Sequence, residues 1–497
     1  MMRICRSIFK KILYCVIASA LFALLLDMLP VHSIVYAEET EPQCWVLVVG
    51  VSEYPILDFN VKVIDENGEA VTNNDLKYSN DDANEIYSSF CSIWGEDNGT
   101  LLLNENATKT DIYYAIKELN EQVSPLDRVL IYFSGHGIAP VEGGQLPGRL
   151  YAQSAGAGYL SPYGTRITHL NYEISSVELA DWLKDLKSNN VVIMLDTCYS
   201  GSFSRELSQR GRIILMSSTD DEPSLECPEI GHGVFTNFIL QAMDDFDKAD
   251  INHDFILSAE EIFGFAEPLT TDGITTCNEE PLANTMKQHP VVSDGYPGEL
   301  GLFMKVNIHC SVPSDSDTIM FDVDGNRYTS LLKSTFTWIP GSAHTIDFPA
   351  TVENEDGERL VLVSWNDGTK SASRTITQGG DYTVTYKKQY KLTINSMYGN
   401  PKGGGWYDDG ATAAISVISP DGKLIRQKFN GWYGSIVTTT KEANVIVDTA
   451  KYINAVWKAD YFRIYMLIAF IVVLLTIAIV LLIMRTKKKH ARSNTAG

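Results

Sequence analysis

Two segments of the sequence each carry one reactive side chain directly after an apolar run of strand length. In residues 129–137 (VLIYFSGHG) that side chain is His136, and in residues 191–203 (VVIMLDTCYSGSF) it is Cys198. Such runs are typical of strands buried on both faces in a parallel sheet. Ligands of these sheets bind beyond the carboxyl ends of the strands, so both side chains are expected at one edge. A histidine that favours the thiolate of a cysteine predicts covalent catalysis.

The pattern around these segments alternates between strands and helices. Further strands are expected at residues 44–50, 100–103 and 212–217, and helices at residues 76–90, 109–123, 175–187 and 234–243. This alternation is typical of an α/β domain with a doubly wound sheet, and helices on both faces are therefore expected.

The hexads YFSGHG (residues 132–137) and DTCYSG (residues 196–201) resemble the two signature segments of the caspase-like cysteine peptidases, and the metacaspase-type branch is the most similar. True caspases carry a QAC-type motif at the nucleophile, which this chain lacks. The resemblance covers roughly residues 43–303. It implies a caspase-like, mostly parallel sheet flanked by helices, and chemistry that requires no cofactor.

The same resemblance implies the roles of the catalytic groups. Cys198 is expected to be the nucleophile, and His136 the general base that activates it and the acid that protonates the leaving amine. The backbone N–H groups of Gly137 and Cys198 are expected to form the oxyanion hole. A glycine suits position 137 because a substrate carbonyl must approach its backbone closely.

A substrate pocket is also implied by the metacaspase resemblance. It consists of Asp196, of Asp82 in the segment Asp81-Asp82-Ala83, and of Ser79 and Ser134. Asp196 precedes Cys198 by two residues, so on a continuing strand both side chains point to the same side. Two carboxylates predict Arg or Lys before the scissile bond, because a cation offsets their desolvation and repulsion. The alternative for Asp82 is a charge that stabilises a helix start.

Residues 250–261 (DINHDFILSAEE) match the ligand spacing of an EF-hand-type loop. The predicted calcium ligands are the side chains of Asp250, Asn252, Asp254, Ser258 and Glu261 and the carbonyl of Ile256. Phe255 stands where the loop prefers glycine for its sharp turn, which argues for low affinity. The alternative is an acidic surface turn, so calcium is expected as a regulator at most.

The remainder of the 497-residue chain divides by composition. Residues 38–304 are expected to form the peptidase domain. Beyond them, short β-type runs rich in Gly, Thr, Tyr and Trp predict two sandwich-like repeats, at residues 305–389 and 390–460, because residues 382–390 resemble residues 453–461. We expect the repeats to act as a stalk, with carbohydrate or protein binding as the alternative.

Two apolar segments predict a membrane-anchored, outward-facing protein. Basic residues, an apolar run and a small-residue site predict a signal peptide at residues 1–37, with an uncleaved anchor helix as the alternative. Residues 464–484 contain no charge and are long enough to span a bilayer. The basic tail, residues 485–497, is then cytoplasmic. A net charge of −22 argues against a nucleic-acid partner.

Together these features predict a single-pass cysteine endopeptidase that cleaves peptides after Arg or Lys outside the cell membrane. Two alternatives remain open. A transpeptidase uses the same acyl-enzyme but resolves it with an amine, and a non-catalytic ectodomain binds or adheres through the same surface. The sequence does not indicate the oligomeric state.

Overall fold

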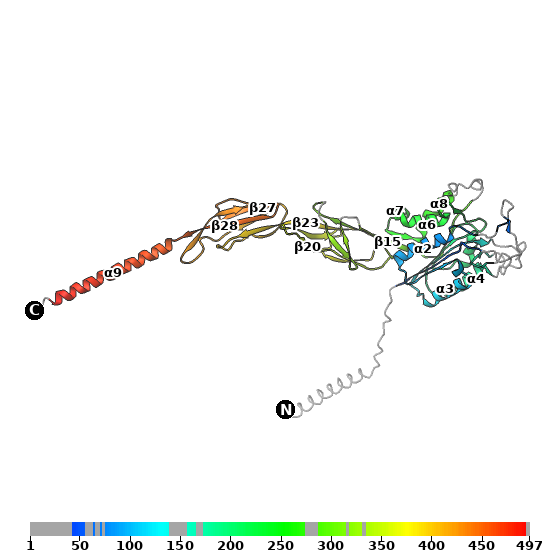
Figure 1. Ribbon diagram of the computed structural model, residues 1–497, viewed down its shortest axis with the longest axis horizontal. Coiled ribbons are helices and arrows are strands. Elements are labelled where there is room, and N and C mark those ends of the chain that lie inside the picture. Colours follow the sequence, from blue (N-terminus) through cyan, green and yellow to red (C-terminus); the bar gives the residue numbers. More distant parts are fainter. Residues whose placement is uncertain are drawn as a thin grey trace, which may run out of the picture.

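The computed structural model describes residues 42–54, 63–64, 70–71, 75–138, 157–165, 172–273, 287–314, 318–330 and 334–493. The chain is elongated, with an α/β domain at one end, two β-rich units in line with it, and helix α9 (Phe462–Ser493) at the other end (Figure 1). The predicted signal peptide, residues 1–37, lies outside the described residues.

The α/β domain is organised around a six-stranded sheet with the order β14-β10-β9-β5-β1-β4. Its strands are β1 (Cys44–Gly50), β4 (Gly99–Leu103), β5 (Arg128–Ser134), β9 (Asn190–Asp196), β10 (Arg212–Met216) and β14 (Val291–Asp294). All neighbours pair in parallel except β14, which runs antiparallel to β10. The predicted mostly parallel sheet is therefore confirmed.

Helices cover both faces of this sheet. Helices α2 (Ser79–Trp94), α6 (Val234–Asp244) and α8 (Ala259–Gly273) contribute to one apolar core, and α3 (Lys109–Gln122), α4 (Ser176–Trp182) and α5 (Ser204–Leu207) to the other. Strand β9 supplies both cores alternately, since Met194 belongs to the first and Ile193 to the second. Two-sided burial explains why the strands read as continuous apolar runs.

Short elements connect these layers. They are β2 (Val63–Ile64), β3 (Ala70–Val71), η1 (Asn104–Asn106), β6 (Gly137–Ile138), β7 (Tyr159–Leu160), β8 (Ile174–Ser175), η4 (Ser200–Phe203), β11 (Glu226–Cys227), β12 (His232–Gly233), α7 (Phe246–Ala249) and β13 (Ile256–Ser258). Helices α3 and α4 each start with a capping box, centred on Thr108 and Ser175. Helix α4 ends at Trp182, five residues before its predicted end at residue 187.

Two β-rich units follow, and each has its own apolar core. Their strands are β15 (Gly301–Ser311), β16 (Met320–Val323), β17 (Asn326–Thr329), β18 (Ser334–Trp338), β19 (His344–Asp347), β20 (Thr351–Glu353), β21 (Glu358–Trp365), β22 (Ser373–Ile376), β23 (Gly380–Asn395), β24 (Gly405–Asp408), β25 (Ala411–Ser416), β26 (Arg426–Gly434), β27 (Glu442–Val447) and β28 (Lys451–Asp460). In each unit, the core lies between two sheets.

The two units repeat one arrangement and share strand β23. In the first unit the last strand, β23, pairs in parallel with the first strand, β15. In the second unit the last strand, β28, pairs in parallel with the far half of β23. Each unit buries one tryptophan on the neighbouring antiparallel strand, Trp365 on β21 and Trp432 on β26. The predicted boundaries after residues 304 and 389 fall inside β15 and β23.

Helix α9 contains a candidate membrane span, Phe462–Lys488, in which an 18-residue window has a mean hydropathy of 3.4. By length and composition it is able to cross a membrane. A single-pass membrane protein is therefore indicated.

Candidate active site

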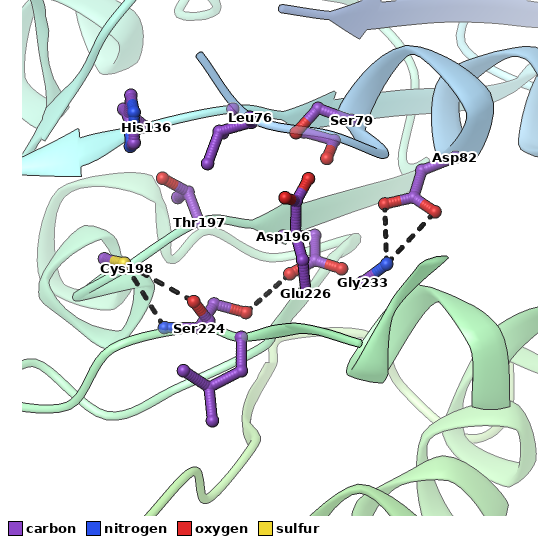
Figure 2. Close-up of a pocket in the computed structure, with 13 residues that line it drawn as sticks. Leu76, Ser79, Asp82, His136, Asp196, Thr197, Cys198, Ser224, Glu226 and Gly233 are labelled. Atoms are coloured by element: carbon purple, nitrogen blue, oxygen red, sulfur yellow. Dashed lines mark hydrogen bonds between the residues drawn. The ribbon is translucent and has the colours of Figure 1, made fainter. Parts of the chain in front are cut away.

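His136 and Cys198 follow the ends of the neighbouring parallel strands β5 and β9, whose last residues, Ser134 and Asp196, lie opposite each other. Both side chains line one pocket at this edge of the sheet (Figure 2). Four other residues predicted for the site line the same pocket: Asp196, Asp82, Ser79 and Ser134. The two catalytic candidates and all four pocket candidates are therefore brought together, although they span well over one hundred residues of sequence.

The thiol of Cys198 lies against the backbone of Ser224. Its Sγ is 3.4 Å from the N–H nitrogen and 3.6 Å from the carbonyl oxygen of Ser224. The chain turns sharply at Tyr199, which adopts a left-handed conformation (φ 60°). Cys198, just before this turn, lines the pocket. Burial raises the pKa of the Cys198 thiol, and Asp196 adds to the shift. The resting residue is therefore a neutral thiol that needs a base to react.

His136 is held by Tyr54, in the loop that follows strand β1. The backbone N–H of His136 donates to the Tyr54 hydroxyl at 2.8 Å, and that hydroxyl donates to the carbonyl of Ser161 at 2.9 Å. The two rings also pack together, with centroids 4.5 Å apart. Tyr54 is buried. Its ring and hydroxyl therefore fix both the backbone and the imidazole of His136.

Gly137 lies directly beside the nucleophile. A Cβ atom added at this position would collide with the carbonyl oxygen of Cys198 and with the hydroxyl of Thr197. Only glycine fits this close approach. The proximity agrees with the predicted oxyanion hole, whose role in binding a substrate oxyanion stays a prediction.

The far end of the pocket contains two buried carboxylates, Asp82 and Asp196. Asp196 accepts hydrogen bonds from the Ser224 hydroxyl at 2.6 Å and from the hydroxyl and N–H of Thr236 at 2.6 and 3.2 Å. Asp82 accepts from the N–H of Gly233 at 3.1 Å. Burial, and then the charge of Asp196, raise the pKa of Asp82 to about 7. The two carboxyl groups therefore share one low-dielectric space.

A third acidic residue, Glu226, lines the pocket from strand β11. Its carboxylate accepts the N–H groups of Lys77 and Tyr78, each at 2.8 Å, just before helix α2. Strand β12 lies opposite, and its Gly233 approaches both aspartates so closely that a Cβ atom would come within 2.6 Å of Asp196 Oδ2. The hairpin β11–β12 is therefore one wall of the pocket.

His232, at the start of β12, contacts the outer side of Asp82. Its Nδ1 is 2.7 Å from Asp82 Oδ1, and its Nε2 is 3.1 Å from Glu85 Oε2. The hydrogen bond to Asp82 raises the pKa of His232. Part of the negative charge of Asp82 is therefore balanced from outside the pocket.

The EF-hand-like segment, residues 250–261, adopts a compact acidic turn, and none of its residues lines the pocket. Asp250 accepts the N–H groups of Asp254 and Phe255 at 3.2 and 3.0 Å. One carboxylate oxygen of Glu261 accepts the N–H of Ile251, and the other accepts the N–H and hydroxyl of Ser258, at 3.0 to 3.1 Å. In the described conformation both oxygens of this predicted ligand are therefore occupied by the turn itself.

Among the described residues, no group of three or more His, Cys, Asp or Glu side chains has the arrangement of a metal site. The expected set of Asp250, Asn252, Asp254, Ile256, Ser258 and Glu261 also includes amide, hydroxyl and carbonyl oxygens. Calcium binding by this set stays a prediction, and no catalytic step depends on it.

The comparison with protein families agrees with this geometry. The caspase domain family (Peptidase_C14) matches residues 43–295, about half of the chain. The chain therefore belongs to the caspase domain family of cysteine peptidases. The crystal structure of a protein from Geobacter sulfurreducens matches at 13% identity over 52% of this chain and 94% of its own length, with a TM-score of 0.34. No curated protein matches the sequence.

Several residues of the site were not predicted from the sequence. They are Leu76, Thr197, Ser224, Leu225, Glu226 and Gly233 in the pocket lining, with Tyr54 and His232 behind it. Ser224 lies in an irregular segment after β10 and Glu226 in the two-residue strand β11, and neither segment carries a periodic pattern. Tyr54 was visible in the sequence as part of the loop after the first strand, but only the fold brings it to His136.

Proposed function

We propose that this protein is a cysteine endopeptidase that cleaves peptide bonds after Arg or Lys through a dyad of Cys198 and His136. The observation that carries this proposal is the convergence of Asp82, Asp196 and Glu226 on the pocket that contains the dyad. None of the described residues that line the pocket is Lys or Arg. A cationic substrate side chain supplies the missing charge and offsets the desolvation of the carboxylates.

In this mechanism the substrate side chain enters between Asp82 and Asp196, which brings the scissile carbonyl to Cys198. His136 takes the thiol proton as Sγ attacks the carbonyl carbon, and the C–N bond breaks as His136 returns the proton to the leaving amine. Water then hydrolyses the thioester, with His136 again as the base. The backbone N–H groups of Gly137 and Cys198 are proposed to hold the oxyanion.

Matched fluorogenic peptides test the proposal. The full chain, purified in detergent, is given peptides that differ only in the residue before the scissile bond: Arg, Lys, Asp or Leu. We expect cleavage after Arg and Lys, and none by Cys198→Ala or His136→Ala. Cleavage after Asp or Leu instead would overturn the specificity, and cleavage by Cys198→Ala would overturn the dyad. Products formed with an added amine distinguish hydrolysis from transpeptidation.

We also propose that helix α9 anchors the peptidase with its ectodomain outside the cell membrane. Arg485, Lys487 and Lys488 follow the apolar stretch, and such residues favour the cytoplasmic side. Cys227 is disulfide-bonded, which suits an oxidising compartment. Protease added outside intact cells should therefore remove the ectodomain and leave a C-terminal epitope intact. Protection of the ectodomain would contradict this orientation.

A further inference from the structure

The second β unit exposes an apolar turn beside the first turn of helix α9. Strand β26 pairs antiparallel with β28, and Arg426 lies opposite Asp460, the last residue of β28. The residues before Arg426 therefore extend past the end of the sheet, to the level where α9 begins (Figure 1). This turn, residues 421–425, presents Leu424 and Ile425 to solvent.

The turn is closed and attached to the helix. Asp421 and Gln427 exchange two backbone hydrogen bonds, at 2.9 and 2.7 Å, which close it. The guanidinium of Arg463, in the first turn of α9, donates to the carbonyl of Lys423 at 3.0 Å. The tip of the turn is therefore held at a defined place against the start of the helix.

The helix presents matching side chains at the same level. Tyr461, Phe462 and Tyr465 are exposed where the apolar stretch starts. Aromatic side chains of this kind are enriched at the membrane–water interface. A soluble stalk has no reason to place two aliphatic side chains next to them, whereas a membrane surface buries all five.

The charges around the turn suit a lipid surface with anionic headgroups. Lys423, Arg426 and Arg463 lie at the turn or at the helix start. Of the two nearby acids, Asp460 is paired with Lys428 at 3.0 Å, and Asp421 accepts the N–H groups of Gly399 and Gly422. Basic residues near an anionic bilayer strengthen binding to it.

We propose that residues 421–425 dock on the outer leaflet of the membrane that α9 crosses, with Leu424 and Ile425 inserted at the level of the headgroups. This inference rests on the proposed anchoring by α9. The docked turn gives the stalk two membrane contacts instead of one. It therefore restricts the tilt of the stalk relative to the membrane and sets the height of the active site above the lipid.

Tryptophan variants of the full chain test this proposal in nanodiscs of phosphatidylcholine and phosphatidylglycerol with brominated acyl chains, which quench nearby tryptophan. Leu424→Trp is compared with Val437→Trp. Leu424 and Val437 are 53% and 75% exposed, and Val437 lies beyond Gly434, at the opposite end of β26. The emission added by Leu424→Trp should be largely lost, and that added by Val437→Trp retained. Equal emission losses in the two variants would overturn the docking.

A third variant separates this proposal from the anchoring on which it rests. Tyr465→Trp on α9 reports insertion of the helix. Quenching of Tyr465→Trp without quenching of Leu424→Trp overturns the docking and leaves the anchor intact, whereas no quenching of either overturns the anchor. Loss of Leu424→Trp emission that does not depend on bromine indicates burial by a second copy, which also overturns the proposal. Replacing Leu424 and Ile425 with Ser should broaden the distribution of stalk tilts seen by electron microscopy.

Discussion

The peptidase domain and the two β-rich units, residues 301–460, which we call the stalk after their expected role, place their carboxylates in opposite environments. In the pocket, the carboxylates of Asp82 and Asp196 are buried together, and burial raises the pKa of Asp82. In the stalk, carboxylates lie at the surface beside cations: hydrogen bonds from Lys387 lower the pKa of Asp408, and those from Arg327 lower the pKa of Asp322. His232 balances the buried pair only in part, so this pair favours a cationic ligand, whereas the exposed carboxylates already have cationic partners.

Their apolar cores differ as well. The peptidase core is split by a sheet whose five parallel strands all end at one edge, which is where the pocket lies. Each stalk core fills the space between two sheets, and its largest buried residues are Trp365 and Trp432. Chemistry is therefore expected in the first region and not in the second, and four predictions sharpen this contrast.

The largest effect is expected from neutralising Asp196. Asp196→Asn keeps the shape of the side chain but removes the charge that faces a cationic substrate. Breaking a buried charge pair costs about 3–5 kcal/mol, so kcat/KM for an Arg peptide should fall by roughly 10²–10⁴-fold. The matched stalk variant, Asp408→Asn, should change it less than about twofold, because that carboxylate is exposed. Similar losses in the two variants would remove the distinction between the regions.

A smaller effect is expected from Tyr54→Phe. The variant keeps the ring on His136 but loses the hydroxyl that joins the His136 N–H to the Ser161 carbonyl. Two lost hydrogen bonds of about 1 kcal/mol each predict a fall in kcat of up to about 30-fold, with KM unchanged. Tyr386→Phe, which loses a hydroxyl bond to Pro349 in the stalk, is the control and should retain full activity. A change in KM without a change in kcat would contradict a positioning role for Tyr54.

The third prediction concerns pH. The pKa of Asp82 is raised to about 7, so between about pH 4 and 7 the folded protein binds a proton that the unfolded chain releases. The free energy of unfolding should therefore fall as pH rises through this window, by on the order of 3–5 kcal/mol. The raised pKa of His232 acts in the same direction, since its contribution is lost as pH rises through the folded value.

Urea unfolding at pH 5 and pH 8 measures this effect. The wild-type peptidase domain should lose stability between the two pH values, and Asp82→Asn should lose less, because asparagine does not titrate. KM for an Arg peptide should also fall a few-fold as pH rises through about 7 in the wild type and remain flat in the variant. An identical pH dependence of stability in the two proteins would show that Asp82 is not the group responsible.

The fold was largely predictable from the sequence because its signals are local. Continuous apolar runs such as residues 191–195 reveal strands buried on both faces, and the break after each run locates His136 and Cys198. The two stalk units were also visible, as a weak repeat. Their boundaries were placed inside β15 and β23, because a strand that continues from one unit into the next leaves no change in composition.

The remainder of the site was not predictable because it depends on contacts between distant segments. Glu226 meets the residues before helix α2 across about 150 positions of sequence, and Ser224 reaches Cys198 from an irregular segment. No periodicity marks such residues. The acidic spacing of residues 250–261, in contrast, is local. Its carboxylates accept N–H groups of the turn, and calcium binding there stays a prediction.

The smallest effect on cleavage is expected from the stalk core. Trp432 is fully buried in the second unit, and Trp432→Ala should destabilise that unit by about 3–5 kcal/mol through the cavity it leaves. Cleavage of a short peptide should not change, because the pocket and its supports lie wholly within the peptidase domain. Phe235→Ala, at a fully buried position in the peptidase core, is the matched control and should lower activity.

Hydrogen exchange shows how far the damage from Trp432→Ala spreads. Strand β23 belongs to both units, but its first half is paired with β15 and β21 inside the first unit. Exchange should therefore accelerate in β25–β28 and in the far half of β23, while β15 and β21 keep their protection. If protection is lost throughout both units, the shared strand makes the stalk one cooperative body, and the stalk then transmits a change at the membrane end directly to the peptidase through β15.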